Sequence, residues 1–369
     1  MFELLIFLGL ALLLYARFVE PRMVRVSVHR VDLWGGGNLP SDEVSGLRRR
    51  VIWNGGRWPR APKAAAGVEP GCSGPRGEAA GSLEAGKVSL RVVLLSDFHY
   101  HRRSVLGTGV LRLVEEVDPD LIFLAGDIIE DDGGIDLAAA ELGRLRASHG
   151  VWAVLGNHDH AFYAPQDILK NNQVPAHAND IARLQRALDG VGIATLMNER
   201  VTLQVRGLRV DLVGVGDLVT GACDLKQAFD GFTPPVDHGV RIVLTHVGAA
   251  AARGFSDDRT VALAGHTHGG QIWIPWLSER LLQSRVNLDY LSGWRPLPRG
   301  GFVYVNRGIG HSHVVPFRFN ASPEVAIFDL VGVPATQSAR ARGAGAALEK
   351  GSPLAPPVGD SSRSGRIGH

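Results

Sequence analysis

The sequence contains little cysteine and almost no net charge. Its 369 residues include only two cysteines, Cys72 and Cys223, which form no C-x-x-C pair. This argues against a disulfide framework and against a zinc–thiolate site. Lys and Arg number 39 against 37 Asp and Glu, so no global basic field favours nucleic acid. We therefore expect no nucleic-acid partner, and no acidic excess argues against a phosphate substrate.

The chain also lacks an apolar run of ordinary membrane-spanning length. Residues 2–15 read FELLIFLGLALLLY, whereas a full span needs about 20 apolar residues. A secretory signal is the alternative, but it should begin with basic residues and end in small ones. Here Arg17, Arg22 and Arg25 follow the run instead. Because basic flanks favour the cytoplasmic side, we predict an anchor at 1–20 in the cell (inner) membrane and a cytoplasmic domain after it.

Composition divides the rest of the chain into four parts. A leading strand is predicted at 21–33, and a Gly/Pro-rich stretch without periodicity then covers 34–87, which we interpret as a mobile insertion. Order returns at Val88, so the catalytic domain is predicted at 88–331. The low-complexity tail at 332–369 is predicted to be disordered.

Apolar strands alternate with helices through the predicted domain. The patterns predict helices at 108–117, 137–147 and 181–188, and strands that include SLRVVLL, DLIFLA, GVWAV, 202–205, 208–215, RIVLT, TVALA, 302–306 and 325–330. Such alternation is typical of α/β layering.

Polar side chains follow five of these strands at the point where each strand ends. The five clusters are Ser96–His99, Gly126–Asp127, Gly156–Asp159, Thr245–His246 and Gly265–His268. Any one of them is more often a turn residue, a helix cap or a hydrogen-bonded histidine than a ligand. Together they supply carboxylate, imidazole and amide donors, which suit Mn, Fe, Zn or similar divalent ions. In an extended segment residues i and i+2 point to one side, so D-x-H and H-x-H can each present two donors to one pocket.

The series D-x-H, GD, GNHD, H and GHTH, in this order, resembles the calcineurin-like metallophosphoesterase superfamily. The resemblance covers about residues 90–330. The stretches GVWAVLGNHD, GHTHGGQI and VNRGIGHSHVVPFRF resemble the bacterial membrane-associated branch, which includes phosphodiesterase-like members and UDP-2,3-diacylglucosamine pyrophosphatases. The resemblance implies a four-layer αββα sandwich with two metal ions at the carboxyl ends of the strands.

The family pattern also implies a role for each matching residue. Seven residues would hold the metals: Asp97, His99 and His268 the first, Asn157, His246 and His266 the second, and Asp127 both. His158 matches the residue that donates a proton to the leaving oxygen, and Asp159 matches a position that can orient this histidine.

These assignments imply a metal-dependent hydrolase that cleaves a phosphodiester or pyrophosphate bond. On this assignment, two metal ions held by these residues would clamp the phosphoryl group and supply a bridging hydroxide for attack on phosphorus. Mn²⁺ is the expected ion, with Fe and Zn as alternatives. The expected partners are a phosphorylated small-molecule or lipid substrate and the membrane, and no obligate protein partner is evident.

Three alternatives stay open at this point. The chain could be a non-catalytic metal-binding scaffold at the membrane, although no ligand of the family pattern is missing. The apolar segment 272–277 is either ordinary core or a lip that touches lipid or an acyl chain. The acidic residues Glu130, Asp131 and Asp132 are expected to form a solvated loop rather than to bind metal.

Overall fold

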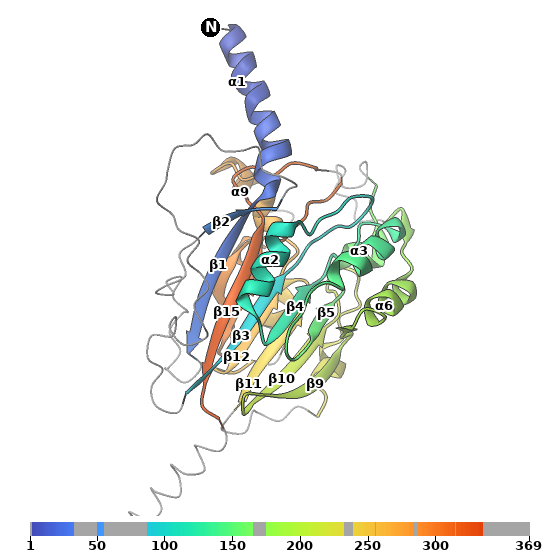
Figure 1. Ribbon diagram of the computed structural model, residues 1–369, viewed down its shortest axis with the longest axis vertical. Coiled ribbons are helices and arrows are strands. Elements are labelled where there is room, and N and C mark those ends of the chain that lie inside the picture. Colours follow the sequence, from blue (N-terminus) through green and yellow to red (C-terminus); the bar gives the residue numbers. More distant parts are fainter. Residues whose placement is uncertain are drawn as a thin grey trace, which may run out of the picture.

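Two β-sheets packed face to face form the centre of the molecule (Figure 1). The computed structural model describes residues 2–32, 50–54, 87–164, 175–231, 239–254, 256–282, 287–313 and 315–334. The first sheet has the order β2-β1-β15-β3-β4-β5-β8. Its strands are β1 (Met23–Asp32), β2 (Arg50–Trp53), β3 (Val88–Leu95), β4 (Leu121–Ala125), β5 (Val151–Val154), β8 (Ile193–Thr195) and β15 (Glu324–Gly332).

The second sheet has the order β13-β14-β12-β11-β10-β9. Its strands are β9 (Glu199–Val205), β10 (Leu208–Val215), β11 (Gly239–Thr245), β12 (Thr260–Ala264), β13 (Gly293–Pro296) and β14 (Phe302–Val305). A short separate pair joins β6 (Ala161–Phe162) to β7 (His177–Ala178). The α/β prediction is confirmed.

Helices cover both outer faces of the paired sheets. The helices α2 (Thr108–Val117), α3 (Ile135–Leu142) and α6 (Ile181–Asp189) share one apolar cluster with the first sheet. The short helices α7 (Leu225–Ala228) and α8 (Gly248–Arg253) share another with the second sheet. A third cluster fills the space between the sheets. Alternate residues of each strand therefore face either the other sheet or the helices.

Parallel pairing brings the ends of several strands together. In the first sheet β3, β4, β5 and β8 run parallel, and in the second β10, β11, β12 and β14 do so. The two sheets are tied at this edge because Nδ1 of His246, after β11, lies 2.8 Å from the carbonyl oxygen of Ala125 in β4. The loops that follow these strands are therefore neighbours.

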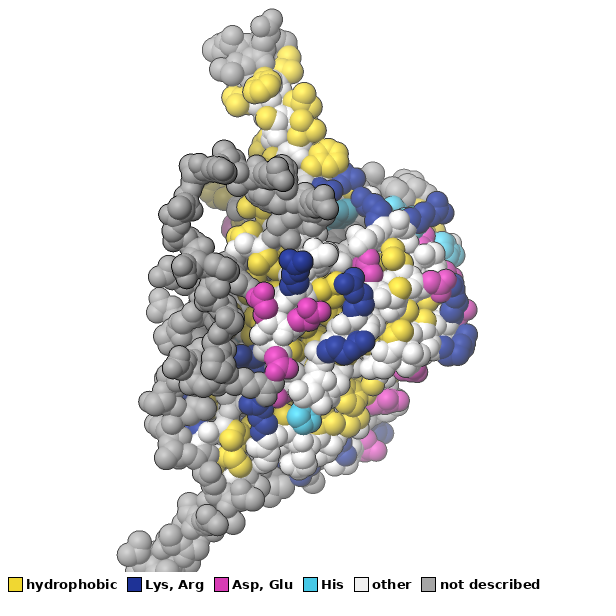
Figure 2. All heavy atoms as spheres, viewed as in Figure 1, with side chains coloured by type: hydrophobic (Ala, Val, Ile, Leu, Met, Phe, Trp, Pro, Cys, Tyr) yellow, Lys and Arg dark blue, Asp and Glu magenta, His cyan; other side chains and the backbone are white. Residues whose placement is uncertain are grey.

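The N-terminal helix α1 (Phe2–Leu14) projects away from the domain (Figure 1). It continues into a π-helical turn, Tyr15–Val19, and a 3₁₀ turn, Glu20–Arg22, before β1 begins. Figure 2 shows mostly apolar side chains along the projecting helix. Among the described residues, no helix is both long and apolar enough to cross a membrane.

The prediction of a transmembrane segment at 1–20 is therefore not supported. The α1 helix contains 13 residues. At about 1.5 Å per residue it extends about 20 Å, against about 30 Å for the hydrocarbon core of a bilayer.

Part of the predicted insertion 34–87 is regular structure. Residues 50–53 form β2, which pairs antiparallel with β1 at the edge of the first sheet. The prediction that this whole segment is a mobile loop is therefore wrong for these residues. Residues 33–49 and 55–86, and the predicted tail from 335 onward, lie outside the described residues.

Candidate metal centre

The predicted site residues come together at the edge where the parallel strands end. Asp97 and His99 follow β3, Asp127 follows β4, and their backbones are joined because the amides of Asp97 and His99 donate to the carbonyls of Gly126 and Asp127 at 3.0 Å. Asn157 begins the helix α4 (Asn157–His160) after β5. The remaining three histidines follow strands of the second sheet.

Five of the seven predicted ligands have left-handed backbone conformations. Their φ angles are 53° for Asp97, 51° for His99, 49° for Asp127, 79° for His266 and 52° for His268. Such a conformation costs a non-glycine residue roughly 1–2 kcal/mol. Strain of this kind gathers at functional sites, where the surrounding structure holds it in place.

Glycine beside the ligands allows the loops to approach closely. A Cβ on Gly156 would lie 2.3 Å from Oδ1 of Asp127, and a Cβ on Gly126 would lie 2.6 Å from Nδ1 of His246. Neither position has room for a side chain. The glycines that precede these polar clusters are therefore part of the construction of the site.

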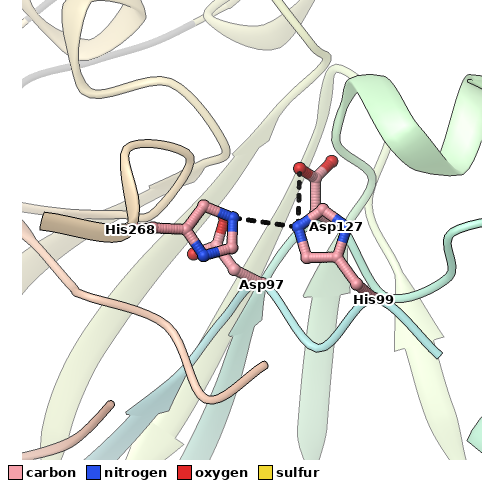
Figure 3. A group of neighbouring side chains, drawn as sticks. All are labelled: Asp97, His99, Asp127 and His268. Atoms are coloured by element: carbon pink, nitrogen blue, oxygen red, sulfur yellow. Dashed lines mark hydrogen bonds and ion pairs between the residues drawn. The ribbon is translucent and has the colours of Figure 1, made fainter. Parts of the chain in front are cut away.

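Asp97, His99 and His268 form what we call the first ligand group, beside Asp127 (Figure 3). One ligand atom from each of these four residues lies within 4.8 Å of the others. Nε2 of His99 lies 2.9 Å from Nε2 of His268 and 3.6 Å from Oδ2 of Asp127. Nε2 of His268 lies 3.7 Å from Oδ1 of Asp97. The donor atoms thus point at one another across a common centre.

Asn157, His246 and His266 form the second ligand group, on the other side of Asp127. Ligand atoms of Asp127, His246 and His266 also lie within 4.8 Å of one another. Nε2 of His246 lies 3.2 Å from Oδ1 of Asp127 and 3.1 Å from Nδ1 of His266. The two oxygens of Asp127 therefore face different groups.

Two buried oxygens in the centre have no hydrogen-bond partner. These are Oδ2 of Asp97 and Oδ1 of Asn157. A buried polar atom without a partner costs free energy, typically about 1–3 kcal/mol. A cation held by the first group would satisfy Asp97, and one held by the second would satisfy Asn157. The residues therefore fit divalent metal ions.

Contacts behind the imidazoles fix which nitrogen faces the centre. Nδ1 of His99 lies 2.7 Å from Oε2 of Glu130, and Nδ1 of His246 lies 2.8 Å from the carbonyl of Ala125. A proton on Nδ1 leaves a lone pair on Nε2 for a metal ion. The contact behind His268 is of another kind: Nη2 of the fully buried Arg318, which can only donate, lies 3.2 Å from Nδ1, so it positions the ring without placing a proton on Nδ1.

Glu130 corrects the expectation of a solvated acidic loop. Its side chain is buried and contacts three histidines from three segments: His99, His158 at 3.2 Å and His313 at 2.6 Å. These histidines together outweigh its burial and hold the pKa of Glu130 far below its usual value. In the sequence, Glu130 lies three residues after the predicted ligand Asp127, which could have indicated a role at the site. Asp131 and Asp132, which follow it, made it look like part of a solvated acidic loop.

Asp159 is placed differently from the role that the family pattern implied. Its carboxylate accepts hydrogen bonds from the backbone amides of Gly156 and Ile129, both at 2.8 Å. The carboxylate that contacts the His158 side chain is Glu130. Asp159 thus shapes the loop that carries Asn157 and His158, and Glu130 orients the His158 ring.

Charge sets the protonation of His158. Burial alone would lower its pKa, but the charges of Asp127 and Glu130 outweigh burial and raise the pKa of His158 to about 9. In the metal-free chain the imidazole is therefore protonated at neutral pH.

Individual histidines of the site differ in charge, and the difference does not follow the division into two groups. Burial, with neighbouring histidines, lowers the pKa of His266 to about 3 and that of His268 well below its usual value. Both are neutral, the form that binds metals. For His246, burial is outweighed by Asp127 and Asp97, which raise its pKa to about 10. A metal ion there would displace a proton.

A cavity of about 550 Å³ opens over both ligand groups. Metal-site residues form part of its lining. Another part is what we call the apolar wall, formed by Ile272, Ile274, Leu277, Leu281 and Val315. Ile274, Trp276 and Leu277 are 42%, 84% and 49% exposed, so ordinary core packing is wrong for this part of 272–277. Leu277 begins the short helix α9 (Leu277–Leu282).

Comparisons with known proteins agree with this geometry. Residues 90–317 match the family model described as calcineurin-like phosphoesterase. The phosphodiesterase YaeI of Escherichia coli is 28% identical over 65% of this chain and 82% of its own length. The UDP-2,3-diacylglucosamine pyrophosphatase LpxG of Chlamydia muridarum is 27% identical over 64% of this chain and 82% of its own.

A bovine relative is described as a transmembrane protein with metallophosphoesterase domain. It is 28% identical over 67% of this chain, which spans only 54% of the bovine protein's length.

Proposed function

Because this chain belongs to the calcineurin-like phosphoesterase family, we propose that it is a dinuclear metal-dependent phosphoesterase that hydrolyses a phosphodiester or pyrophosphate bond. One observation carries the proposal. The carboxylate of Asp127 lies between two groups of donor atoms, with Oδ2 toward His99 and Oδ1 toward His246. A carboxylate in this position can bridge two cations.

The first and second ligand groups would each hold one divalent ion, with Mn²⁺ expected and Fe or Zn as alternatives. Mixed carboxylate, imidazole and amide donors suit these ions. When bound, a metal pair supplies an activated water and stabilises the charge that develops on the phosphoryl oxygens.

His158 would protonate the leaving oxygen. Its ring lines the cavity over the ligand groups, and the neighbouring carboxylates of Asp127 and Glu130 favour its protonated form. Glu130 holds the ring through Nδ1 at 3.2 Å, which directs Nε2 away from Glu130. This is the geometry that a general acid needs, and proton transfer of this kind typically contributes about 10²–10⁴-fold to the rate.

The substrate is proposed to carry an apolar group beside its phosphorus. The apolar wall and the metal-site residues line the same cavity. A free nucleotide or sugar phosphate would leave this wall in water, whereas an acyl chain would cover it. The LpxG relative is described as acting on a diacylated, nucleotide-linked pyrophosphate. We propose a lipid-linked or nucleotide-linked substrate of this general kind.

The chain is proposed to act at a membrane surface, with its catalytic domain on the cytoplasmic side. Described side chains of α1 such as Ile6, Phe7 and Leu13 are 56%, 67% and 58% exposed. An exposed apolar surface of this extent marks a contact with a membrane or another protein. The helix α1 would enter the bilayer from the side on which the domain lies.

Hydrolysis of bis(p-nitrophenyl) phosphate by the Mn²⁺-loaded full chain tests the function. We expect turnover by the native chain and none above background by Asp127→Ala. A native chain that binds two ions but hydrolyses no phosphodiester or pyrophosphate would favour the non-catalytic scaffold instead. If the native chain is active, a screen of cell lipids and metabolites, with Asp127→Ala as the blank, would identify the substrate.

A further inference from the structure

A second cavity, of about 170 Å³, also has His99 in its wall but is lined by a different set of residues. Four chain segments form it: the turns that follow α1, Asn54 after β2, the loop after β3, and the segment after β14. Its lining includes three arginines, Arg17, Arg22 and Arg103, and no aspartate or glutamate. Among its other lining residues are His101, His311 and His313.

Among the described residues, no carboxylate pairs with the positive charge of this cavity. In the part of the chain that the structure describes, none of the three arginines forms an ion pair with a carboxylate. Arg22 donates to the carbonyl of Phe18, and the Arg17 guanidinium lies 5.2 Å from the centre of the Phe18 ring. Burial lowers the pKa of Arg17, and the charges of Arg103 and Arg22 lower it further.

Two carboxylates lie close by, but histidines of the wall engage them. Oδ2 of Asp131 lies 2.7 Å from Nδ1 of His101, and Oε1 of Glu130 lies 2.6 Å from Nδ1 of His313. Each histidine thereby separates a carboxylate from the cavity. Arg17 is repelled by Arg103 and by Arg22, and no described carboxylate lines the cavity, so a bound anion would stabilise this site.

We propose that this cavity binds a phosphate group at a site next to the metal centre but distinct from the cavity over the two ligand groups. Guanidinium groups match phosphate oxygens with paired hydrogen bonds, which makes arginine the favoured residue for this ligand. The cavity lies where the projecting helix α1 joins the domain, and Figure 2 shows Lys and Arg side chains gathered there. A phosphate bound here would lie beside the metal centre, because His99 belongs to both sites.

The phosphate could come from a lipid headgroup or from a free phosphate in solution. The same arginines would bind either one, and hydrolysis is not required. The inference therefore stands or falls separately from the proposed activity.

The first arm of the test measures binding of inorganic phosphate by calorimetry. It uses the full chain in a neutral detergent and carries Asp127→Ala, so that phosphate cannot bind through the metals. Arg103→Ala should weaken binding by about tenfold or more, because a charge-assisted pair is lost. Arg103→Lys should have a smaller effect. Arg102→Ala is the matched control, since Arg102 is exposed and lies outside the cavity lining.

The second arm measures binding of the same chains to phosphatidylcholine vesicles with and without phosphatidic acid. If the ligand is a lipid headgroup, Arg103→Ala should lose most of the added binding while Arg102→Ala keeps it. If Arg103→Ala weakens binding and Arg102→Ala does not, in either arm, the site is supported. The arm in which this occurs identifies the source of the phosphate. Equal effects of Arg102→Ala and Arg103→Ala in both arms, or no effect of either, would overturn the proposal, because only diffuse surface charge would then be at work.

Discussion

The two ligand groups on either side of Asp127 are held in different ways. In the first group, side chains from distant segments hold the imidazoles. Glu130 contacts Nδ1 of His99 at 2.7 Å, and Arg318 contacts Nδ1 of His268 at 3.2 Å. Both contacts are made by side chains, 31 and 50 positions from the histidines that they hold, so a substitution can remove either one.

In the second group, the backbone provides more of the contacts that hold the ligands. The carbonyl of Ala125 contacts Nδ1 of His246 at 2.8 Å, and Asn157 is fixed at the first turn of α4. Substitutions cannot remove a backbone carbonyl. The comparison teaches that a first-group histidine can be weakened by replacing the side chain behind it, whereas substitution cannot remove the contact behind His246.

The largest effect is expected where the two groups meet. Asp127→Ala should remove both metal ions and reduce hydrolysis to background, because each group loses a donor. Asp97→Ala should reduce only the first ion, and His246→Ala only the second. Metal content per chain, measured by mass spectrometry after repletion and desalting, checks all three. Loss of both ions from each single-group variant would show that the groups are not separate.

His158→Ala should leave both groups intact and still lower turnover. We expect kcat to fall by about 10²–10⁴-fold, because the leaving oxygen loses its proton donor. Metal content should match the native chain. His177→Ala is a suitable control because that imidazole is exposed on β7. Native turnover in metal-replete His158→Ala would remove His158 from the mechanism.

Glu130→Gln tests the difference between the groups directly. Loss of a partner behind a ligating histidine typically costs about 10–100-fold in metal affinity. We expect that loss for the first ion and little change for the second, as measured by competition with a chelator. Asp131→Asn, one residue along the same loop, is the control. Equal weakening of both ions would contradict the comparison.

The smallest effect is expected at the apolar wall. Leu277→Ser or Leu281→Ser should raise KM for an acylated phosphodiester by about threefold to tenfold, since each removes part of an apolar contact. Neither should change KM for bis(p-nitrophenyl) phosphate, and Val191→Ser is a control at an exposed apolar position elsewhere. Equal changes for both substrates would place the acyl group away from this wall.

Local patterns in the sequence predicted much of the fold. The helix predicted at 108–117 and the strand at 208–215 match α2 and β10 residue for residue. Both have clear periodicity and clear ends. For example, α2 ends at Val117. The next residue, Asp118, has a left-handed φ of 47°, and Pro119 follows it. The strand β2 was missed because four residues inside a Gly/Pro-rich stretch show no usable period.

Motifs predicted the ligand side chains but not what holds them. The seven predicted ligands lie at strand ends, as expected from the sequence, in which each cluster directly follows a predicted strand. Glu130 and Arg318 become significant only through contacts across the fold, with His99 and His268, which lie 31 and 50 positions from them in the sequence. Nothing in a local pattern distinguishes a buried glutamate with three histidine partners from a solvated one.

Anomalous diffraction from crystals loaded with Mn²⁺ tests the central claim most directly. The account predicts two peaks per chain, one beside each oxygen of Asp127, with the first among Asp97, His99 and His268 and the second among Asn157, His246 and His266. A single peak, or manganese bound elsewhere while these seven side chains stay uncoordinated, would contradict it.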